Sequence, residues 1–135
     1  QDIVRFASAC SLPLVPSGGR TGLSGGAVAA NGELVVSFDR MRRILGFDPI
    51  DRTVTVEAGV LTATLQAFAR ERSLYYPVSF AAEGSSQLGG NVATNAGGIR
   101  VLRYGLTRDW VVGLKIVTGA GELIEPERDG TTAGA

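Results

Sequence analysis

The stretch Pro16-Ser17-Gly18-Gly19-Arg20-Thr21-Gly22-Leu23-Ser24-Gly25-Gly26 decides the fold of this chain, together with Leu88-Gly89-Gly90-Asn91-Val92-Ala93-Thr94-Asn95-Ala96-Gly97-Gly98. Glycine lets a backbone approach a ligand closely and adopt a positive φ at no steric cost. Consecutive free N–H groups in such loops form concave anion sites. Two of these stretches in one small domain predict one long ligand with two negative charges, such as the pyrophosphate of a dinucleotide.

The segments around the first stretch predict a mixed architecture. Apolar residues at helical spacing predict an amphipathic helix over 2–11, with Ile3, Phe6, Ala7 and Cys10 on its buried face. Short apolar runs at Leu12–Val15 and Leu34–Val36 predict buried strands. Residues 43–48 and 52–58 predict two strands joined by the turn Asp48-Pro49-Ile50-Asp51.

The second half of the chain adds a helix and a hairpin. Residues 62–73 predict a helix with Thr62 as its N-cap. Residues 110–118 predict a strand with Val112, Leu114 and Ile116 facing inward, and Glu122–Ile124 returns as its partner. We therefore expect an α+β fold, with a short parallel sheet and helices plus a small, mainly antiparallel sheet.

Composition excludes several function classes. The chain of 135 residues has no histidine and one cysteine, which excludes a Ser-His or Cys-His nucleophile and leaves no metal site to assign. Thirteen basic and thirteen acidic side chains do not suggest a nucleic-acid partner. No apolar run is long enough to span a membrane. The single cysteine is typical of a reducing compartment, so we expect a cytoplasmic protein, with peripheral membrane association left open.

The second stretch carries more chemical information than the first. We expect Gly89-Gly90 to precede a short helical turn and to present free N–H groups to a phosphate. The stretch places three polar side chains close together, those of Asn91, Thr94 and Asn95. A turn with a purely structural role would not need three. A Walker A loop is excluded because the one lysine follows Leu114, and no glycines show the Rossmann spacing, so a dinucleotide requires another fold.

The two stretches strongly resemble the FAD-binding domain of the vanillyl-alcohol oxidase / p-cresol methylhydroxylase superfamily. The similarity runs from about Phe6 to Ile124 and continues through further segments, namely Glu57-Ala58-Gly59-Val60, Gly84-Ser85, Arg103-Tyr104-Gly105 and Gly113-Leu114. Within the superfamily, the second stretch is most similar to the D-2-hydroxyacid dehydrogenase branch, which includes D-lactate dehydrogenases and the glycolate oxidase flavoprotein subunit. Ser79 departs from that branch, where an acidic residue often stands.

This resemblance implies a PCMH-type FAD-binding domain at residues 1–125, N-terminally incomplete, followed by a linker-like tail at 126–135 toward a missing substrate domain. It implies a flavin-dependent oxidoreductase that oxidises a D-2-hydroxyacid to the 2-oxoacid by hydride transfer to FAD. The base, the carboxylate-binding residues and any metal ligands would come from the missing domain, so no catalytic residue is assigned here. The resemblance leaves the electron acceptor open.

The resemblance also implies which residues hold the cofactor. The expected FAD-binding residues are Ser17, Gly18, Gly19, Arg20, Thr21, Gly22, Gly25, Gly26, Gly84, Ser85, Gly89, Gly90, Asn91, Thr94, Asn95 and Gly98. Gly59 and Gly113 are expected only to allow close backbone packing. Some members of the superfamily tether FAD through a Gly-Gly-His arrangement. Here Gly18-Gly19-Arg20 stands in that place, and Cys10 is expected on a buried face, so non-covalent FAD is expected.

Two other functions remain open at this stage. One is a flavoenzyme similar to UDP-N-acetylenolpyruvoylglucosamine reductase, against which the long second stretch argues. The other is a non-catalytic flavin- or nucleotide-binding module.

Overall fold

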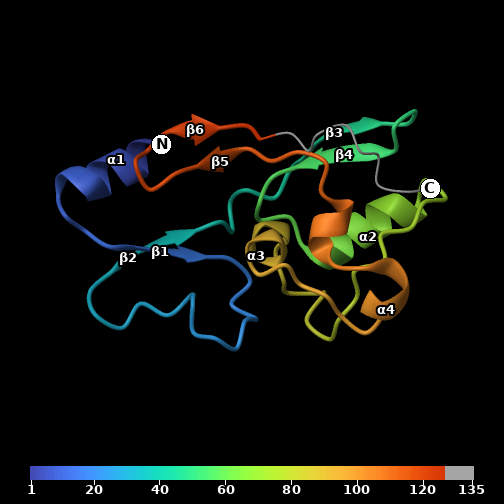
Figure 1. The fold of residues 1–135 in the computed structure, drawn as a ribbon, viewed down its shortest axis with the longest axis horizontal. Helices are drawn as coiled ribbons and strands as arrows, with labels where there is room; N and C mark the ends of the chain where they lie inside the picture. The colour runs from blue at the N-terminus through green and yellow to red at the C-terminus, as the bar shows by residue number, and fades with distance from the viewer. Residues whose placement is uncertain (127–135) are drawn as a thin grey trace.

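The computed structural model describes residues 1–126, which form an α+β fold of short helices and two-stranded sheets (Figure 1). The elements in chain order are α1 (Asp2–Ala9), β1 (Leu14–Ser17), β2 (Leu34–Ser37), β3 (Ile44–Asp48), β4 (Thr53–Val56), α2 (Thr62–Arg70), α3 (Leu88–Ala93), α4 (Val101–Tyr104), the 3-10 helix η1 (Thr107–Trp110), β5 (Ile116–Val117) and β6 (Leu123–Ile124). The predicted fold class is confirmed.

Strands β1 and β2 pair in parallel, from Leu14 opposite Leu34 to Ser17 opposite Ser37. The carboxyl ends of parallel strands lie at the same edge of a sheet, which is where ligands bind in α/β sheets. The first glycine stretch leaves β1 at this edge. It forms the open blue-to-cyan loop between β1 and β2 in Figure 1. The pairing of β1 with β2 therefore places the start of this loop at the ligand-binding edge of the sheet.

Strands β3 and β4 form the predicted antiparallel hairpin. Asp48 closes its turn, because the Oδ1 atom accepts hydrogen bonds from the N–H groups of Ile50 at 2.7 Å and Asp51 at 3.1 Å. The expected turn signal is confirmed by an Asp side chain that bonds its own backbone.

The core forms where β4 and α2 meet the second glycine stretch. Its buried residues are Val60, Leu65 and Leu88, with Val54, Val56 and Tyr76 packed against them. Helix α2 ends at Arg70, three residues before the predicted end. The prediction of Thr62 as N-cap is wrong: Leu61 occupies that position without a side-chain cap bond. The Thr62 side chain is fully buried and bonds to other segments instead.

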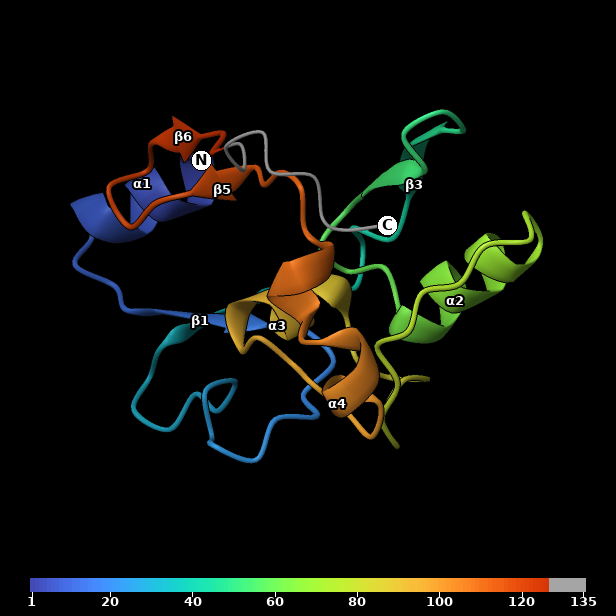
Figure 2. The same ribbon diagram turned by 45° about the vertical axis from the view of Figure 1, so that its right-hand side comes forward.

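Helix α1 is confirmed, but its predicted buried face is not. Ile3 and Phe6 are 53% and 58% exposed, and only Ala7 is buried. Cys10 lies just beyond the helix and is exposed, so its expected place on a buried face is wrong. The reason is a narrow contact: α1 meets the turn between β5 and β6, where Gln1 Nε2 donates to the Gly121 carbonyl at 3.1 Å (Figure 2).

The predicted strand over residues 110–118 is also shorter than expected. It comprises Ile116–Val117 only, paired with Leu123–Ile124. Val112 and Ile116 do not face inward, since they are 51% and 38% exposed. Among the described residues, no hydrophobic core packs on this hairpin. Apolar side chains that alternate along a strand stay exposed when no second layer covers them.

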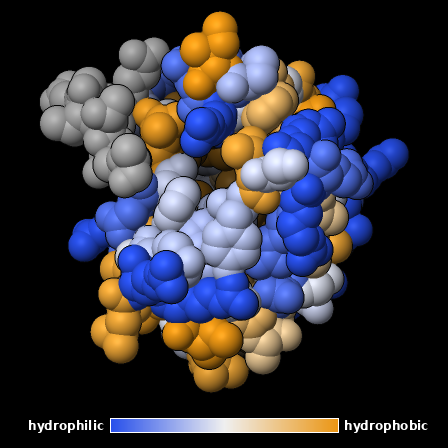
Figure 3. Space-filling model, turned by 90° about the vertical axis from the view of Figure 1, so that its right-hand side faces the viewer, coloured by the Kyte–Doolittle hydropathy of each residue, from blue (hydrophilic) through white to orange (hydrophobic). Residues whose placement is uncertain are grey.

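The end of the molecule farthest from α1 is largely hydrophilic, with separate hydrophobic groups near its edges and a hollow near its middle (Figure 3). No helix of the described residues is long and apolar enough to cross a membrane. The predicted tail at 126–135 lies outside the described residues, apart from Pro126.

Candidate functional site

The first glycine stretch meets the segment that leads into the second one in the folded chain. A Cβ atom on Gly19 would overlap the carbonyl oxygen of Ser85 and would lie 2.8 Å from the Ser86 Cα atom. The neighbouring Gly18 faces the Gln87 side chain, with Oε1 3.3 Å from the position of a Cβ atom. The end of β1 therefore lies directly on the segment that leads into α3, and residues nearly seventy positions apart in the sequence share one site.

A backbone ladder holds the segment before α3 in place. The Thr62 N–H donates to the Ser86 carbonyl at 3.0 Å, and the Leu88 N–H donates to the Val60 carbonyl at 2.9 Å. The Gly89 N–H donates to the Ala58 carbonyl at 2.8 Å. These bonds correct one expectation. Gly89 and Gly90 lie inside α3 rather than before it, and the Gly89 N–H is already used by the fold.

A buried polar network fastens α3 to α2. The Asn91 Nδ2 atom donates to Thr62 Oγ1 at 2.7 Å, and Thr62 Oγ1 lies 2.7 Å from Ser86 Oγ. All three residues are at least 96% buried. Buried polar groups require such partners because an unpaired one costs free energy. The network fixes the orientation of the short helix that carries the second glycine stretch.

The polar side chains of the second stretch thus have structural roles, contrary to expectation. Asn91 belongs to the buried network, and Thr94 Oγ1 donates to the Gly90 carbonyl at 2.9 Å. Asn95 has a positive φ of 48°, and its Oδ1 accepts from the Arg108 N–H at 3.0 Å. Hydrogen bonds within the fold account for all three side chains, so their polarity alone does not identify a ligand site.

The first stretch behaves differently, because its backbone donors are free. From Gly18 to Gly26, no backbone N–H donates to a backbone carbonyl of the described residues. Arg20 and Gly25 have positive φ values of 56° and 77°. A run of unpaired N–H groups in a loop that turns by left-handed residues is the arrangement that binds anions.

Seven glycines in and near the two stretches fall into two groups. Some are required by the fold: Gly19, Gly89 and Gly98 press on the backbone or side chains of Ser85, Ala58 and Ser79. Others meet nothing within 4 Å and have no positive φ, namely Gly22, Gly26, Gly84 and Gly90. Folding does not need glycine at these four positions, whereas close approach of a ligand would.

Gly59 and Gly113 were expected to allow close packing. Gly59 confirms this, since a Cβ atom there would overlap the Phe38 carbonyl oxygen. Gly113 contradicts it, because nothing lies within 4 Å of its Cβ position. The departure at Ser79 is also resolved, as its Oγ donates to Glu83 Oε2 at 3.2 Å, so a local hydrogen bond forms without an acidic residue at that position.

Sequence reasoning missed Gln87 and Asp39. Gln87 Nε2 donates to Asp39 Oδ1 at 2.9 Å, across forty-eight positions of the sequence. Asp39 also accepts from Arg42 Nη2 at 2.8 Å and from Ser37 Oγ at 3.0 Å. The Arg42 and Ser37 hydrogen bonds hold the pKa of the Asp39 carboxyl below its usual value. No sequence pattern marks this cluster, because only the fold brings its members together.

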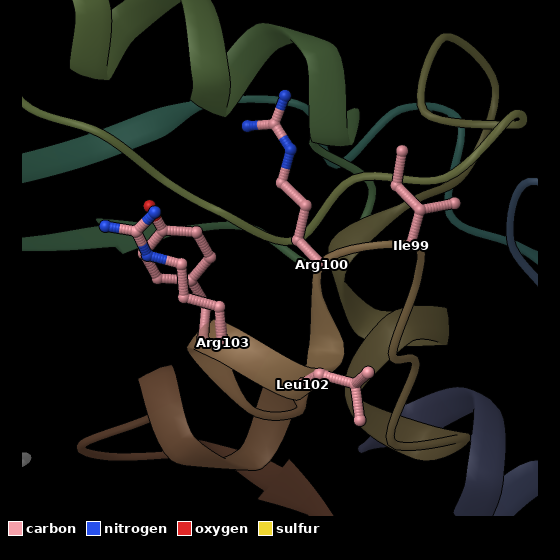
Figure 4. Close-up of a pocket in the computed structure, with 5 residues that line it drawn as sticks. Ile99, Arg100, Leu102 and Arg103 are labelled. Carbon is pink, nitrogen blue, oxygen red and sulfur yellow. The ribbon is translucent and has the colours of Figure 1, made fainter.

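A hollow on the surface begins at Ile99, directly after the second glycine stretch. It has a volume of about 380 Å³ and is lined by Ile99, Arg100, Leu102, Arg103 and Tyr104. Figure 4 shows that the Arg100 and Arg103 side chains extend in different directions. They therefore do not converge on one point, and the hollow is not a second anion site. Within the part of the chain that the structure describes, no group of three His, Cys, Asp or Glu residues could hold a metal.

The site brings together the end of β1, the segment before α3, and α3 itself. Of the expected cofactor residues, Ser17, Gly18, Gly19, Ser85, Gly89 and Asn91 lie at this junction. Thr21, Gly22, Gly25 and Gly26 lie in the exposed loop that follows. Gly98 packs on Ser79 and Asn95 bonds Arg108, so both support the turn after α3, and their expected role toward the cofactor stays a prediction.

Comparison with known proteins identifies the family of the chain. The family model described as FAD binding domain matches residues 1–126. The chain is 63% identical to a D-2-hydroxyglutarate dehydrogenase of Stutzerimonas stutzeri (strain A1501), over 96% of this chain and 28% of the relative. It is 41% identical to a D-lactate dehydrogenase of Anaerostipes hadrus, over 91% of this chain and 26% of the relative. Glycolate oxidase subunit GlcD of Bacillus subtilis (strain 168) is 39% identical, over 91% and 27%.

Solved structures share the fold at lower identity. An alkyldihydroxyacetonephosphate synthase superposes with a TM-score of 0.80 at 22% identity, over 98% of this chain and 26% of that one. The 6-hydroxy-D-nicotine oxidase of Arthrobacter nicotinovorans gives 0.79 at 23% identity, over 95% and 27%. The chain spans little more than a quarter of these proteins. It belongs to the FAD-binding domain family, and its cofactor is FAD.

Proposed function

We propose that this chain is the FAD-binding portion of an enzyme that oxidises a D-2-hydroxyacid to the 2-oxoacid. The observation that carries the proposal is the junction of Gly18-Gly19 with Ser85-Ser86, which brings the first glycine stretch to the segment that leads into the second. The identities of 63% and 41% to a D-2-hydroxyglutarate dehydrogenase and a D-lactate dehydrogenase support the substrate class. We expect the substrate domain in another part of the intact protein. That part would determine which hydroxyacid is oxidised and which electron acceptor is used.

The residues present fit FAD. The unpaired N–H groups from Gly18 to Gly26 offer donors for a pyrophosphate, and the positions of Gly22, Gly84 and Gly90 leave space where a side chain would stand. Arg20, exposed beside these donors, would offset phosphate charge. When bound, the flavin supplies the acceptor for the hydride that leaves C2 of the hydroxyacid. This chain would position the cofactor, while the acid–base groups come from elsewhere in the intact protein.

Substrate oxidation by the intact, flavin-loaded protein tests the proposal. We expect D-2-hydroxyglutarate or D-lactate to bleach the oxidised flavin absorbance without oxygen, and an artificial electron acceptor to restore it with formation of the 2-oxoacid. The L-enantiomers are the control and should leave the flavin oxidised. Bleaching by NADPH alone would favour the reductase alternative. A flavin that no D-2-hydroxyacid reduces would favour the non-catalytic module and would contradict the proposal.

We also propose that the enzyme is cytoplasmic, because a single cysteine is typical of proteins in a reducing compartment.

A further inference from the structure

The Gln87 side chain carries a buried hydrogen-bond acceptor that nothing uses. Gln87 is 2% exposed. Among the buried side-chain oxygen and nitrogen atoms of the described residues, its Oε1 is the one that has no hydrogen-bond partner. Such an atom costs stability in a finished structure, so its retention requires a reason. The question is which donor the atom serves.

The orientation of the Gln87 amide is imposed by Asp39. An ionised carboxylate only accepts hydrogen bonds, and Asp39 is kept ionised by Arg42 and Ser37, which lower its pKa. The Gln87 Nε2 atom must therefore face Asp39, at 2.9 Å, and Oε1 must face the other way. Oε1 therefore faces Gly18, at the start of the first glycine loop.

The first loop has the matching donors. The N–H groups of Gly18, Gly19 and Arg20 are among those that donate to no backbone carbonyl of the described residues. One unpaired acceptor thus lies beside Gly18, the first residue in a run of unpaired donors. The backbone of Gln87 is itself held in place, because both of its neighbours are hydrogen-bonded. The Ser86 carbonyl accepts from the Thr62 N–H, and the Leu88 N–H donates to the Val60 carbonyl.

We propose that Gln87 is a positioning residue for the FAD-binding loop, whose Oε1 accepts a hydrogen bond from a backbone N–H of Gly18–Arg20 when the loop binds FAD. Asp39 orients the amide, and Gln87 transmits that orientation to the loop. The loop's remaining N–H groups are then held ready for the cofactor. This inference rests on FAD binding and not on the hydroxyacid chemistry, so its test is independent of any substrate.

The test compares the intact apo-protein and three variants by FAD titration and thermal unfolding. Gln87→Met keeps the side-chain length and removes both polar atoms. We expect its FAD dissociation constant to rise about tenfold, since one hydrogen bond is lost in the bound state. Its apo-protein loses the Nε2–Asp39 hydrogen bond and also the unpaired acceptor; these effects oppose each other, so its melting temperature should change little. Asp39→Asn is the matched control and should change FAD affinity less, since its amide oxygen still accepts from Gln87.

A reversed pair provides the rescue. In the double variant Asp39→Asn/Gln87→Glu, built in an Arg42→Met background because Arg42 and Gln87 donate to the same Oδ1 atom of Asp39, the amide introduced at position 39 donates to one oxygen of the carboxylate introduced at position 87, and the other oxygen still faces the loop. We expect FAD affinity within about threefold of wild type. Trypsin provides a readout besides affinity, because Arg20 is exposed in the loop. Saturating FAD should slow cleavage after Arg20 in the wild type and the double variant, and much less in Gln87→Met, while cleavage after Arg52 in the β3–β4 turn stays constant.

Two results would overturn the proposal. Unchanged FAD affinity and unchanged protection of Arg20 in Gln87→Met would show that Oε1 plays no part in holding the loop. A loss of affinity matched by a lower melting temperature of the apo-protein, with no rescue by the reversed pair, would show a structural role only. A wild-type protein that binds FAD but oxidises no hydroxyacid would refute the proposed activity and leave this comparison intact.

Discussion

Gly19 lies so close to Ser85 that a Cβ atom on Gly19 would overlap the Ser85 carbonyl oxygen. This contact joins the carboxyl end of β1 to the segment before α3. It also separates two reasons for glycine in one sequence motif. Gly19 is there because the chain crosses itself, whereas Gly22, three residues later, meets nothing within 4 Å.

Alanine at these two positions should have opposite consequences. Gly19→Ala must displace the backbone of Ser85 and Ser86, which we expect to cost about 1–3 kcal/mol of unfolding free energy. Gly22→Ala should leave the unfolding free energy within about 0.5 kcal/mol of wild type and weaken FAD binding. Chemical denaturation of the apo-proteins and FAD titration measure the two quantities. Equal stability of the two variants would contradict the crossing seen at Gly19.

Gly89 and Gly90 form a second matched pair within α3. A Cβ atom on Gly89 would lie 2.8 Å from the Ala58 Cβ atom, so Gly89→Ala should lower stability. Gly90 faces open space in a helix, where alanine is favoured over glycine by about 0.5–1 kcal/mol. We therefore expect Gly90→Ala to raise the melting temperature of the apo-protein and to reduce FAD affinity. Gly90→Val should abolish FAD binding while the chain still folds. Undiminished FAD affinity in either Gly90 variant would remove this residue from the cofactor site.

Thr62 is the centre of the buried network, bonded to both Asn91 and Ser86. Thr62→Val keeps the shape and removes the hydroxyl, which leaves the Asn91 Nδ2 atom buried without its acceptor. We expect a loss of about 1–3 kcal/mol in unfolding free energy. Thr62→Ser retains the hydroxyl and is the control for the network. If serine proves as destabilising as valine, packing of the methyl group, and not hydrogen bonding, is the main contribution.

Tyr76 should make stability fall at alkaline pH. Burial raises the pKa of its phenol to about 12, against a side-chain hydrogen bond with Thr107 that lowers it. Because the folded pKa lies above the ordinary value of 10.0, the neutral phenol stabilises the fold fully below pH 10, and this contribution is lost as the pH rises toward 12. Tyrosinate absorbance of wild type minus Tyr76→Phe should show one late-titrating phenol. A midpoint near 10 in that difference would contradict the burial of Tyr76.

FAD should be held without a covalent bond. Arg20 stands after Gly18-Gly19, and its protonated guanidinium cannot attack the flavin. Acid precipitation of the flavin-loaded protein is therefore expected to leave yellow colour in the supernatant. The exposed Cys10 is the thiol to check, and Cys10→Ser should behave identically. Flavin fluorescence that travels with the protein band on a denaturing gel would show a covalent link.

The sequence by itself determined the elements and the family. Local signals were sufficient for the Asp48 turn, for the helix that begins at Thr62 and for the strand at Leu34, because hydrophobic spacing and turn chemistry act over a few residues. The two glycine stretches were sufficient to identify an FAD-binding domain, since their residue order is specific.

Only the tertiary structure decided what each residue does. It assigned Thr62 to a buried network instead of a cap, and it left Ile3 and Phe6 exposed because α1 meets little more than the turn at Gly121. It divided the glycines into those that the fold requires and those that it leaves free, and it brought Gln87 beside Gly18. These outcomes depend on contacts between segments dozens of residues apart, and spacing along a sequence carries no record of which distant backbone will lie against it.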